Sequence, residues 1–446
     1  MIFIMLLDCT WPNLADNSMT KIFMKAFITI SLVLFCFISN AQFQLNGELR
    51  PRLEYRDGYK SPVDSSSDPA MFVTQRTRLN ALYTKDDLKV GISLQDIRVW
   101  GSQSQQNLSD GLFSVSEAWF EYNMTKKFSL KAGRQQLVYN DHRIFGNSDW
   151  NSQGRSHDLL LLKFSDSTWT IHTGLAFNQN KEQLTTTLYT VTNSYKAMQY
   201  LWLNKKINKV DASFLFVNNG IQSPVSNTSI RYNQVSGVHF EYNADKSWTM
   251  LKGYYQSGDD GVTKKQLNAF LAGIEFMYKI NPEISLAAGY EFLSGQSQTD
   301  STSAYREKLH SFTPLYGTGH KFSGYMDYFY AGSSHGGVGL QDVYLRIKYQ
   351  KKKFFVYLEP HYFMAAAEVL DVEELSNNGK YQSMPSALGT EVDLSLGYVP
   401  SRTINFKLGY SQMFGNSTLE LLKGGDTGKT NNWAYFMITV KPEFIK

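Results

Sequence analysis

The chain has 446 residues, of which 42% are hydrophobic and 14% aromatic, and its formal net charge is +4. This composition excludes a bundle of transmembrane helices, because no segment after the amino-terminal region approaches about eighteen consecutive apolar residues. The charge is mild and no dense run of Lys or Arg occurs, which argues against a nucleic-acid-binding protein. The high aromatic content is instead typical of membrane β-barrels, in which aromatic girdles mark both interfaces.

The first 41 residues have the parts of a secretory signal peptide. Lys21 and Lys25 precede an apolar run at 26–38, and small residues ending at Ala41 offer a cleavage site. About thirteen apolar residues are too few to span a bilayer comfortably. We therefore expect the chain to be exported and cleaved near Ala41.

This signal divides the chain into three segments. We expect residues 1–18 to reflect a mis-called translation start, residues 19–41 to be the signal peptide, and residues 42–446 to form a single domain. Both cysteines, Cys9 and Cys36, precede the cleavage site. An exported domain without cysteine relies on its fold rather than on disulfides.

The exported part begins with a strictly alternating segment, 43–56. Apolar residues such as Leu45 and Leu49 occupy one parity, and charged residues such as Glu48 and Arg50 occupy the other. Period-two alternation places the two sets on opposite faces of a strand. One such strand fits a soluble sandwich as well as a membrane barrel, so the repetition of the pattern decides between them.

Similar alternating segments recur to the end of the chain. We predict eighteen strands, most of them about 9 to 13 residues long, which is the length that a tilted strand needs to cross a bilayer. They are expected at 43–56, 72–84, 88–100, 114–122, 127–138, 157–165, 168–177, 197–205, 209–218, 231–243, 247–257, 266–279, 283–294, 338–350, 352–364, 388–398, 402–413 and 431–441.

The connections between these strands alternate between short and long. Short turns such as 84–87 and 243–246 are followed by long connections such as 139–156 and 295–337. We therefore predict an all-β fold, a transmembrane antiparallel β-barrel of about 18 strands in the bacterial outer membrane, with short periplasmic turns and long extracellular loops. Segment 323–331 also alternates, but a nineteenth strand would break the even count, so we place it inside the long loop.

One face of most predicted strands is apolar enough to contact lipid. Ile274 and Phe276 share a parity, for example, and Glu275 lies on the opposite one. Two places, 95–98 and 132–135, break this parity. Each requires a β-bulge or an early exit of the strand from the bilayer.

A barrel of this size keeps an aqueous lumen unless something plugs it. Basic residues on inward parities and in loops predict an anion pathway, because a guanidinium group pairs bidentately with a carboxylate. The pathway residues we expect are Arg50, Arg52, Arg76, Arg78, Arg98, Arg134, Arg143, Arg155, Arg346, Lys348 and Lys407. The alternative is a polar wall in which these residues pair with acidic neighbours. Those neighbours are Glu48, Glu54, Glu117, Glu121, Glu359, Glu391 and Asp393.

Signals of catalysis are weak in this sequence. Segment 332–336 has the formal spacing of a nucleophile elbow, but that motif needs a strand–turn–helix setting, and this segment is a Gly-rich approach to a strand. We predict no enzymatic activity, no catalytic residue, no metal and no cofactor. A barrel hydrolase that uses Ser333 or Ser334 with His335 is the alternative.

Several short blocks resemble the alginate export family of outer-membrane porins and occur in that family's order. They are RTRL at 76–79, LQDIRVWG at 94–101, EAW at 117–119, GRQ at 133–135, RIFG at 143–146, SDW at 148–150, GR at 154–155 and GHKFSGYMD at 319–327. The resemblance covers most of residues 43–444 and is strongest in the first third. It implies an eighteen-stranded barrel whose Arg-lined constriction passes an anionic polysaccharide outward.

We therefore predict an outer-membrane porin that passes an anionic, alginate-like polysaccharide or oligosaccharide through an Arg-lined pore. A general channel for other polar solutes and a surface-binding barrel without transport are the alternatives. The expected partners are outer-membrane lipid, the anionic saccharide and periplasmic export or assembly proteins, with no nucleic acid.

The connection within 131–164 is distinctive for its content. Its length is ordinary for an extracellular barrel loop, but it combines Arg134, Arg143 and Arg155 with Trp150. We expect the constriction of the pore at this connection.

Overall fold

The computed structural model describes residues 42–446 with the exception of 65, 107–110, 192–193, 223–228 and 330–336. Its main strands are β1 (Gln42–Asp57), β2 (Ala70–Lys85), β3 (Leu88–Val99), β4 (Phe113–Asn123), β5 (Phe128–Gln135), β6 (His157–Ser165), β7 (Trp169–Phe177), β8 (Ala197–Ile207), β9 (Val210–Gln222), β10 (Ile230–Asn243), β11 (Ser247–Gly258), β13 (Ala269–Lys279), β14 (Ile284–Leu293), β16 (Leu340–Lys351), β17 (Phe354–Met364), β18 (Ala387–Ser401), β19 (Ile404–Gly415) and β20 (Asn431–Val440).

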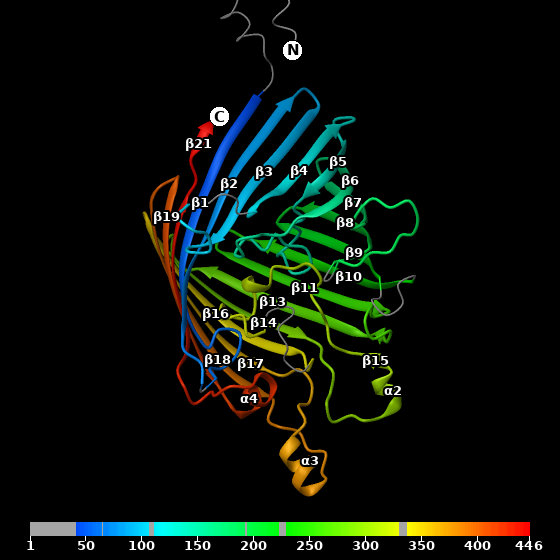
Figure 1. Ribbon diagram of the computed structural model, residues 1–446, viewed down its shortest axis with the longest axis vertical. Coiled ribbons are helices and arrows are strands. Elements are labelled where there is room, and N and C mark those ends of the chain that lie inside the picture. Colours follow the sequence, from blue (N-terminus) through cyan, green and yellow to red (C-terminus); the bar gives the residue numbers. More distant parts are fainter. Residues whose placement is uncertain (1–41, 65, 107–110, 192–193, 223–228, 330–336) are drawn as a thin grey trace, which may run out of the picture.

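Within the described residues, these eighteen strands form one closed antiparallel barrel (Figure 1). Each strand pairs with the next one along the chain, and β20 pairs back with β1 to close the sheet. A short final strand, β21 (Glu443–Ile445), also pairs with β1. The predicted fold class, with eighteen strands and full closure, is confirmed.

The remaining elements lie in the connections. They are β12 (Gln266–Leu267) and β15 (Lys308–Leu309), which form a two-residue parallel pair, the helices α2 (Ser303–Arg306), α3 (Val372–Asn378) and α4 (Ser417–Lys423), and the 3-10 turn η1 (Gly319–Lys321). Helices α2, α3 and α4 lie at the end of the barrel opposite to the start of β1 and the carboxyl terminus (Figure 1). No helix in the described part of the chain is long and apolar enough to cross a membrane.

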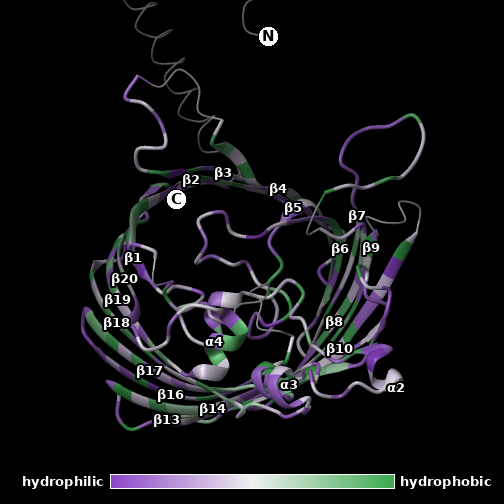
Figure 2. Cartoon of the chain, turned by 60° about the horizontal axis from the view of Figure 1, so that its bottom comes forward, coloured by the Kyte–Doolittle hydropathy of each residue, from purple (hydrophilic) through white to green (hydrophobic). Residues whose placement is uncertain are grey.

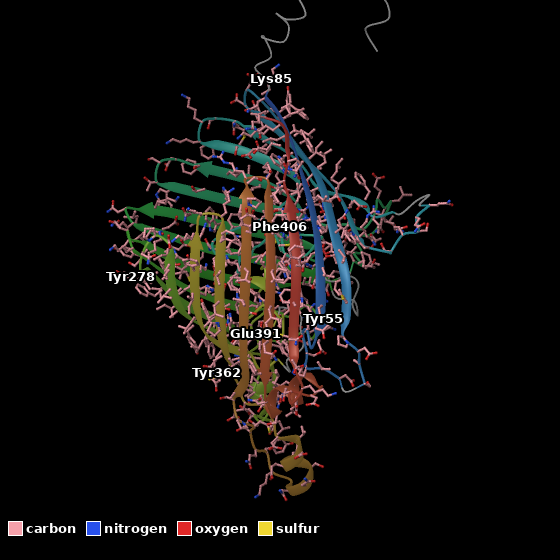
Figure 3. All side chains as sticks on the ribbon, turned by 90° about the vertical axis from the view of Figure 1, so that its left-hand side faces the viewer. Tyr55, Lys85, Tyr278, Tyr362, Glu391 and Phe406 are labelled. Atoms are coloured by element: carbon pink, nitrogen blue, oxygen red, sulfur yellow. The ribbon has the colours of Figure 1, made fainter. Side chains whose placement is uncertain are left out.

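The outer face of the barrel is apolar. On β13, 46% of Ile274 and 49% of Phe276 is exposed, whereas Glu275 between them faces inward and is 9% exposed. Figure 3 shows side chains that project from the outer wall, including Tyr278 and Tyr362, and Lys85 at the end with the short turns. Lipid therefore takes the place of a protein core against this face.

Both predicted parity breaks correspond to irregularities in the sheet. Near 95–98, the pairing of β3 with β4 shifts by one residue, which leaves Ser116 of β4 without a partner in the register. Near 132–135, Gly133 has a φ of +114°, and a Cβ atom there would lie 2.3 Å from the carbonyl oxygen of Ala118. Only glycine fits that backbone conformation at such close approach.

Two connections fold into the lumen instead of extending outward. We call residues 136–156 the first inward loop and residues 312–329, the later described part of the long connection after β14, the second inward loop. Figure 2 looks into the barrel from its long-loop end and shows segments of chain inside the ring of strands. Strand β5 ends at Gln135, three residues before the predicted end, because the chain turns inward and buries Leu137 and Tyr139 there.

The two inward loops build two buried hydrophobic clusters against the wall. The first loop packs Phe145 against inward residues of β6 to β14, and Phe145 is fully buried. The second loop packs Met326 and Tyr328 against β16 to β20. Segment 323–329 is therefore part of the long connection and not a nineteenth strand, as predicted. Residues 330–331 lie outside the described residues.

Candidate functional site

Four arginines of β1 and β2 point into the lumen and hold the first inward loop. Their guanidinium groups reach main-chain carbonyl oxygens of that loop. Arg50 Nη1 donates to the carbonyl of Asp149 at 2.7 Å, and Arg52 Nη1 donates to the carbonyl of Trp150 at 2.8 Å. Arg76 and Arg78 donate to the carbonyls of residues 149–153 at 3.1 to 3.4 Å. Because the four side chains are at most 9% exposed, their main partners are the loop and the wall.

We call Arg50, Arg52, Arg76 and Arg78 the arginine row. Acidic residues pair with its guanidinium groups. Glu48 accepts from Arg76 Nε at 2.7 Å, and Glu54 accepts from Arg52 Nε at 2.8 Å. Asp149 adds a carboxylate 2.8 Å from Arg76 Nη2. Partial burial alone would raise the pKa of Asp149, but the nearby arginines outweigh burial and hold that pKa below its usual value. The pairing with Glu48 and Glu54 that the polar-wall alternative predicts is therefore present.

Carboxylates on the opposite wall hold the second inward loop. Glu391 accepts from the main-chain N–H of Met326 at 2.7 Å, and Glu359 accepts from the Tyr325 hydroxyl at 2.7 Å. Gly324 beside them has a φ of +79°, and a Cβ atom there would lie 2.5 Å from the Glu391 carboxyl group. The first loop is thus bound through its carbonyls by arginines, and the second through its donors by carboxylates.

The two loops meet in the lumen through aromatic rings. Trp150 of the first loop stacks on His320 of the second, with 4.3 Å between ring centroids and an angle of 12°. Arg52 lies over the Trp150 ring at 4.2 Å, and Tyr435 of β20 packs edge-on against the same ring at 4.9 Å. Trp150 is therefore the contact point of the arginine row, both loops and β20.

A cavity of about 480 Å³ lies beneath the loops on the side of the short turns. The first loop contributes Asn140 and Asp141 to its lining, and the second contributes Lys321 and Phe322. The wall residues are Glu241, Asn243, Ala244, Ser247, Trp248, Met250, Lys252, Glu275, Met277, Lys279, Ser285, Ala287, Tyr344, Arg346 and Lys348. Five of the lining residues are basic and three are acidic, so the cavity carries an excess of positive charge.

Three lysines of this cavity have no carboxylate partner among the described residues. Lys279 and Lys348 come from the inward parity of β13 and β16, and Lys348 Nζ lies 5.3 Å from the centre of the Tyr357 ring. Lys321 Nζ donates only to the main-chain carbonyl of Asp141, at 2.9 Å. The ammonium groups are therefore available to an anion in the cavity.

Two other predicted pathway cations form ion pairs with acidic residues. Arg143 Nη2 lies 2.5 Å from Glu291, and Arg346 lies 2.5 Å from Glu275 and 2.6 Å from Glu359. Arg346 still lines the cavity, whereas Arg143 lies in the first inward loop and is 5% exposed.

The last predicted cations are dispersed. Arg155 Nη1 donates to the carbonyl of Gly317 and so ties the inward loops together, and Lys407 of β19 lies 5.7 Å from the Tyr435 ring. Arg98 and Arg134 lie on outward parities, where they pair with Asp96 and Asp158 respectively. The structure does not bring these two arginines into the lumen.

The sequence analysis missed Lys252, Lys279 and Lys321 as members of the cavity. The parity of β11 and β13 marks Lys252 and Lys279 as inward residues, so alternation alone could have found them. No periodic signal exists for Lys321, because its place depends on the path of a loop. In the described part of the chain, no group of three or more His, Cys, Asp or Glu could hold a metal ion.

A closed barrel with an apolar outer wall, a polar lumen and inward loops defines an outer-membrane channel of the porin class. Residues 41–416 match the protein family described as alginate export. The chain belongs to this family. A search of curated proteins finds no significant match.

Solved structures of outer-membrane proteins have the same fold. The outer membrane protein OprD from Pseudomonas aeruginosa is 12% identical and has a TM-score of 0.60, with 92% of this chain and 95% of that chain covered. OpdK from the same organism is 10% identical over 90% of this chain and 99% of that chain, with a TM-score of 0.58. OpdO is 13% identical over 90% and 98%, with a TM-score of 0.57. At these identities the likeness concerns the fold alone.

Proposed function

We propose that this protein is a passive outer-membrane channel for an anionic, alginate-like saccharide, and that the cavity beneath the inward loops is its vestibule. One observation carries the proposal. Lys279, Lys321 and Lys348 converge on one cavity without a carboxylate partner among the described residues. Unpaired ammonium groups in a confined aqueous space raise the local concentration of anions.

The cavity also suits a sugar ring. Trp248, Phe322 and Tyr344 line it together with the lysines. Aromatic side chains offer apolar faces and, for Trp and Tyr, a polar group at the rim. The family's description as alginate export favours a carboxylate-bearing polysaccharide. Uronate units combine a sugar ring with a carboxylate. The aromatic residues of the lining suit the ring, and the lysines suit the carboxylate.

The arginine row has a different role in this proposal from the one that the family resemblance implies. Arg50, Arg52, Arg76 and Arg78 set the position of the first inward loop, and thereby the shape of the channel, while lysines contact the solute. Transport needs no covalent chemistry, because a concentration gradient or periplasmic partners supply the free energy. The segment with Ser333, Ser334 and His335 lies outside the described residues.

Ion selectivity in planar bilayers tests the proposal. We expect the purified barrel to prefer anions, and the double substitution Lys279→Gln and Lys348→Gln to move the reversal potential in a salt gradient toward that of a non-selective pore. Lys126→Gln, at an exposed short turn, is the matched control and should leave the reversal potential unchanged. Cation selectivity in the unmodified barrel would contradict the proposal.

A surface-binding barrel without transport is the second candidate. The two buried clusters that the inward loops build inside the lumen favour it, because loops packed this way restrict the free cross-section. This candidate predicts negligible conductance from a correctly folded barrel at any voltage.

A further inference from the structure

Four charged residues link the first inward loop to the wall above the cavity. Lys252 Nζ of β11 lies 2.7 Å from Asp141 Oδ2 and 2.5 Å from Glu291 Oε2 of β14. Glu291 Oε1 in turn lies 2.5 Å from Arg143 Nη2. Two of these residues belong to the loop and two to the barrel. The ion pairs therefore fasten the turn 141–143 to the wall.

The charges around this turn do not balance. Arg143, Lys252 and Lys321 all lie over one aromatic ring, that of Phe322, at 4.4, 4.8 and 5.7 Å from its centre. Asp141 is the carboxylate on the cavity side of this group, and Glu291 lies behind it in the wall. Three cations thus share two carboxylates. Glu275 of the same cavity pairs with Arg346, so Lys321 is the cation of this group that has no ion pair with a described carboxylate.

The fastened turn is bent on both sides of Asp141. Asn140 has a φ of +51° and His142 a φ of +72°, a left-handed conformation that side chains other than glycine adopt rarely. Burial alone would raise the pKa of Asp141, but Lys252 and His239 outweigh it and hold that pKa well below its usual value. Asp141 is therefore a carboxylate anion held against Lys252.

We propose that Lys252 is a carboxylate-exchange site, at which Asp141 occupies the place of a ligand carboxylate that enters the cavity from the short-turn end. Binding of a uronate at Lys252 displaces Asp141 and loosens the turn at this residue, while Arg143 stays paired with Glu291 and the His142 carbonyl still accepts from the main chain of Thr318. The inference rests on the proposed function only for the class of ligand, an anionic saccharide.

The geometry explains why exchange is feasible at this position. Lys252 has three donors, and Glu291 keeps one of them when Asp141 leaves, so the ammonium group is never without a partner. Lys321 lies at the same cavity and supplies a second cation to the arriving carboxylate. The remainder of the first inward loop stays bound by the arginine row.

Equilibrium binding to the detergent-solubilised barrel tests the exchange. The probe is a trimer of galacturonic acid, followed by the fluorescence of Trp248, with Trp248→Phe identifying that signal and maltotriose as the neutral sugar. Asp141→Asn removes the internal competitor, and because the lost bond is a charge-assisted one, the expected gain in affinity is about tenfold or more. Asp68→Asn, exposed on the loop between β1 and β2, is the control and should bind like the unmodified chain.

Adding Lys252→Gln to Asp141→Asn should abolish the gain. Movement of the turn has a separate readout, because a chain that begins at Gln42 contains no cysteine. With His142→Cys, the galacturonate trimer should accelerate labelling by a maleimide, and maltotriose should not. Unchanged or weaker binding of the trimer by folded Asp141→Asn protein would overturn the inference.

The two proposals fail in different ways. A barrel that does not conduct but binds the trimer more tightly after Asp141→Asn refutes transport and supports the exchange site. An anion-selective barrel whose trimer affinity is indifferent to Asp141→Asn refutes the exchange site and supports transport.

Discussion

Trp150 and His320 stack with their ring planes 12° apart and join the two inward loops inside the barrel. Neither residue belongs to a barrel strand, and each loop is bound to a different wall. The stack therefore couples the arginine row of β1 and β2 to the carboxylates of β17 and β18, together with the main-chain hydrogen bonds between residues 142–146 and 316–318 and the bond from Arg155 to Gly317. These contacts together join the two loops.

Trp150→Ala should weaken the contact between the loops. The substitution removes the stack with His320, the cation–π contact with Arg52 and the edge contact with Tyr435. Because Trp150 is only partly buried, its deletion should cost less than the about 3 to 5 kcal/mol of a fully buried Trp. We expect larger and noisier single-channel currents than in the unmodified barrel. Trp169→Ala, outside the lumen at a short turn, is the control, and equal current noise in both variants would contradict the coupling.

Arg76 and Arg134 form a matched pair for a stability measurement. Arg76 is fully buried and contacts Glu48 and Asp149, whereas Arg134 is half-exposed on the outer parity with Asp158. Arg76→Gln leaves two carboxylates short of a partner and should destabilise the barrel by about 3 to 5 kcal/mol. Arg134→Gln should cost under about 1 kcal/mol. Urea unfolding in detergent measures both values, and equal costs would refute the anchoring role of Arg76.

Docking of the first inward loop should weaken only in acid. The pKa of Asp149 is depressed in the folded state, so its contribution is complete above the usual carboxyl value of 3.8 and is lost as the pH falls through the depressed value. The fluorescence of Trp150 should therefore stay constant from neutral pH down to 3.8 and change as the pH falls through the depressed pKa of Asp149. Asp149→Asn should lose this component of the titration. A change centred above 3.8 that persists in Asp149→Asn would contradict the assignment.

The strands were predictable because a membrane barrel imposes period two on every crossing. Lipid outside and water inside leave each inward residue polar or small and each outward residue apolar, as Glu275 beside Ile274 and Phe276 illustrates. The two parity breaks were visible for the same reason. Strand ends were less certain where the chain turned into the lumen, as at Gln135.

The candidate site was predictable only in part. The inward parity of Arg50, Arg52, Arg76 and Arg78 follows from alternation, but their binding to the carbonyls of 149–153 depends on the path of a loop. Asp141 and Lys252 likewise lie 111 residues apart in the chain, and no local pattern links them. Arg134 was placed at the constriction because it adjoins a loop, although its own strand parity directs it outward.

Single-channel current in the presence of sugars tests the central claim most directly. The galacturonate trimer, added on the side of the short turns, should block the current at concentrations at which maltotriose has no effect. The Lys279→Gln and Lys348→Gln double variant should lose most of this difference, and Lys126→Gln should retain it. Equal block by the charged and the neutral sugar in the unmodified barrel would contradict a channel for anionic saccharides.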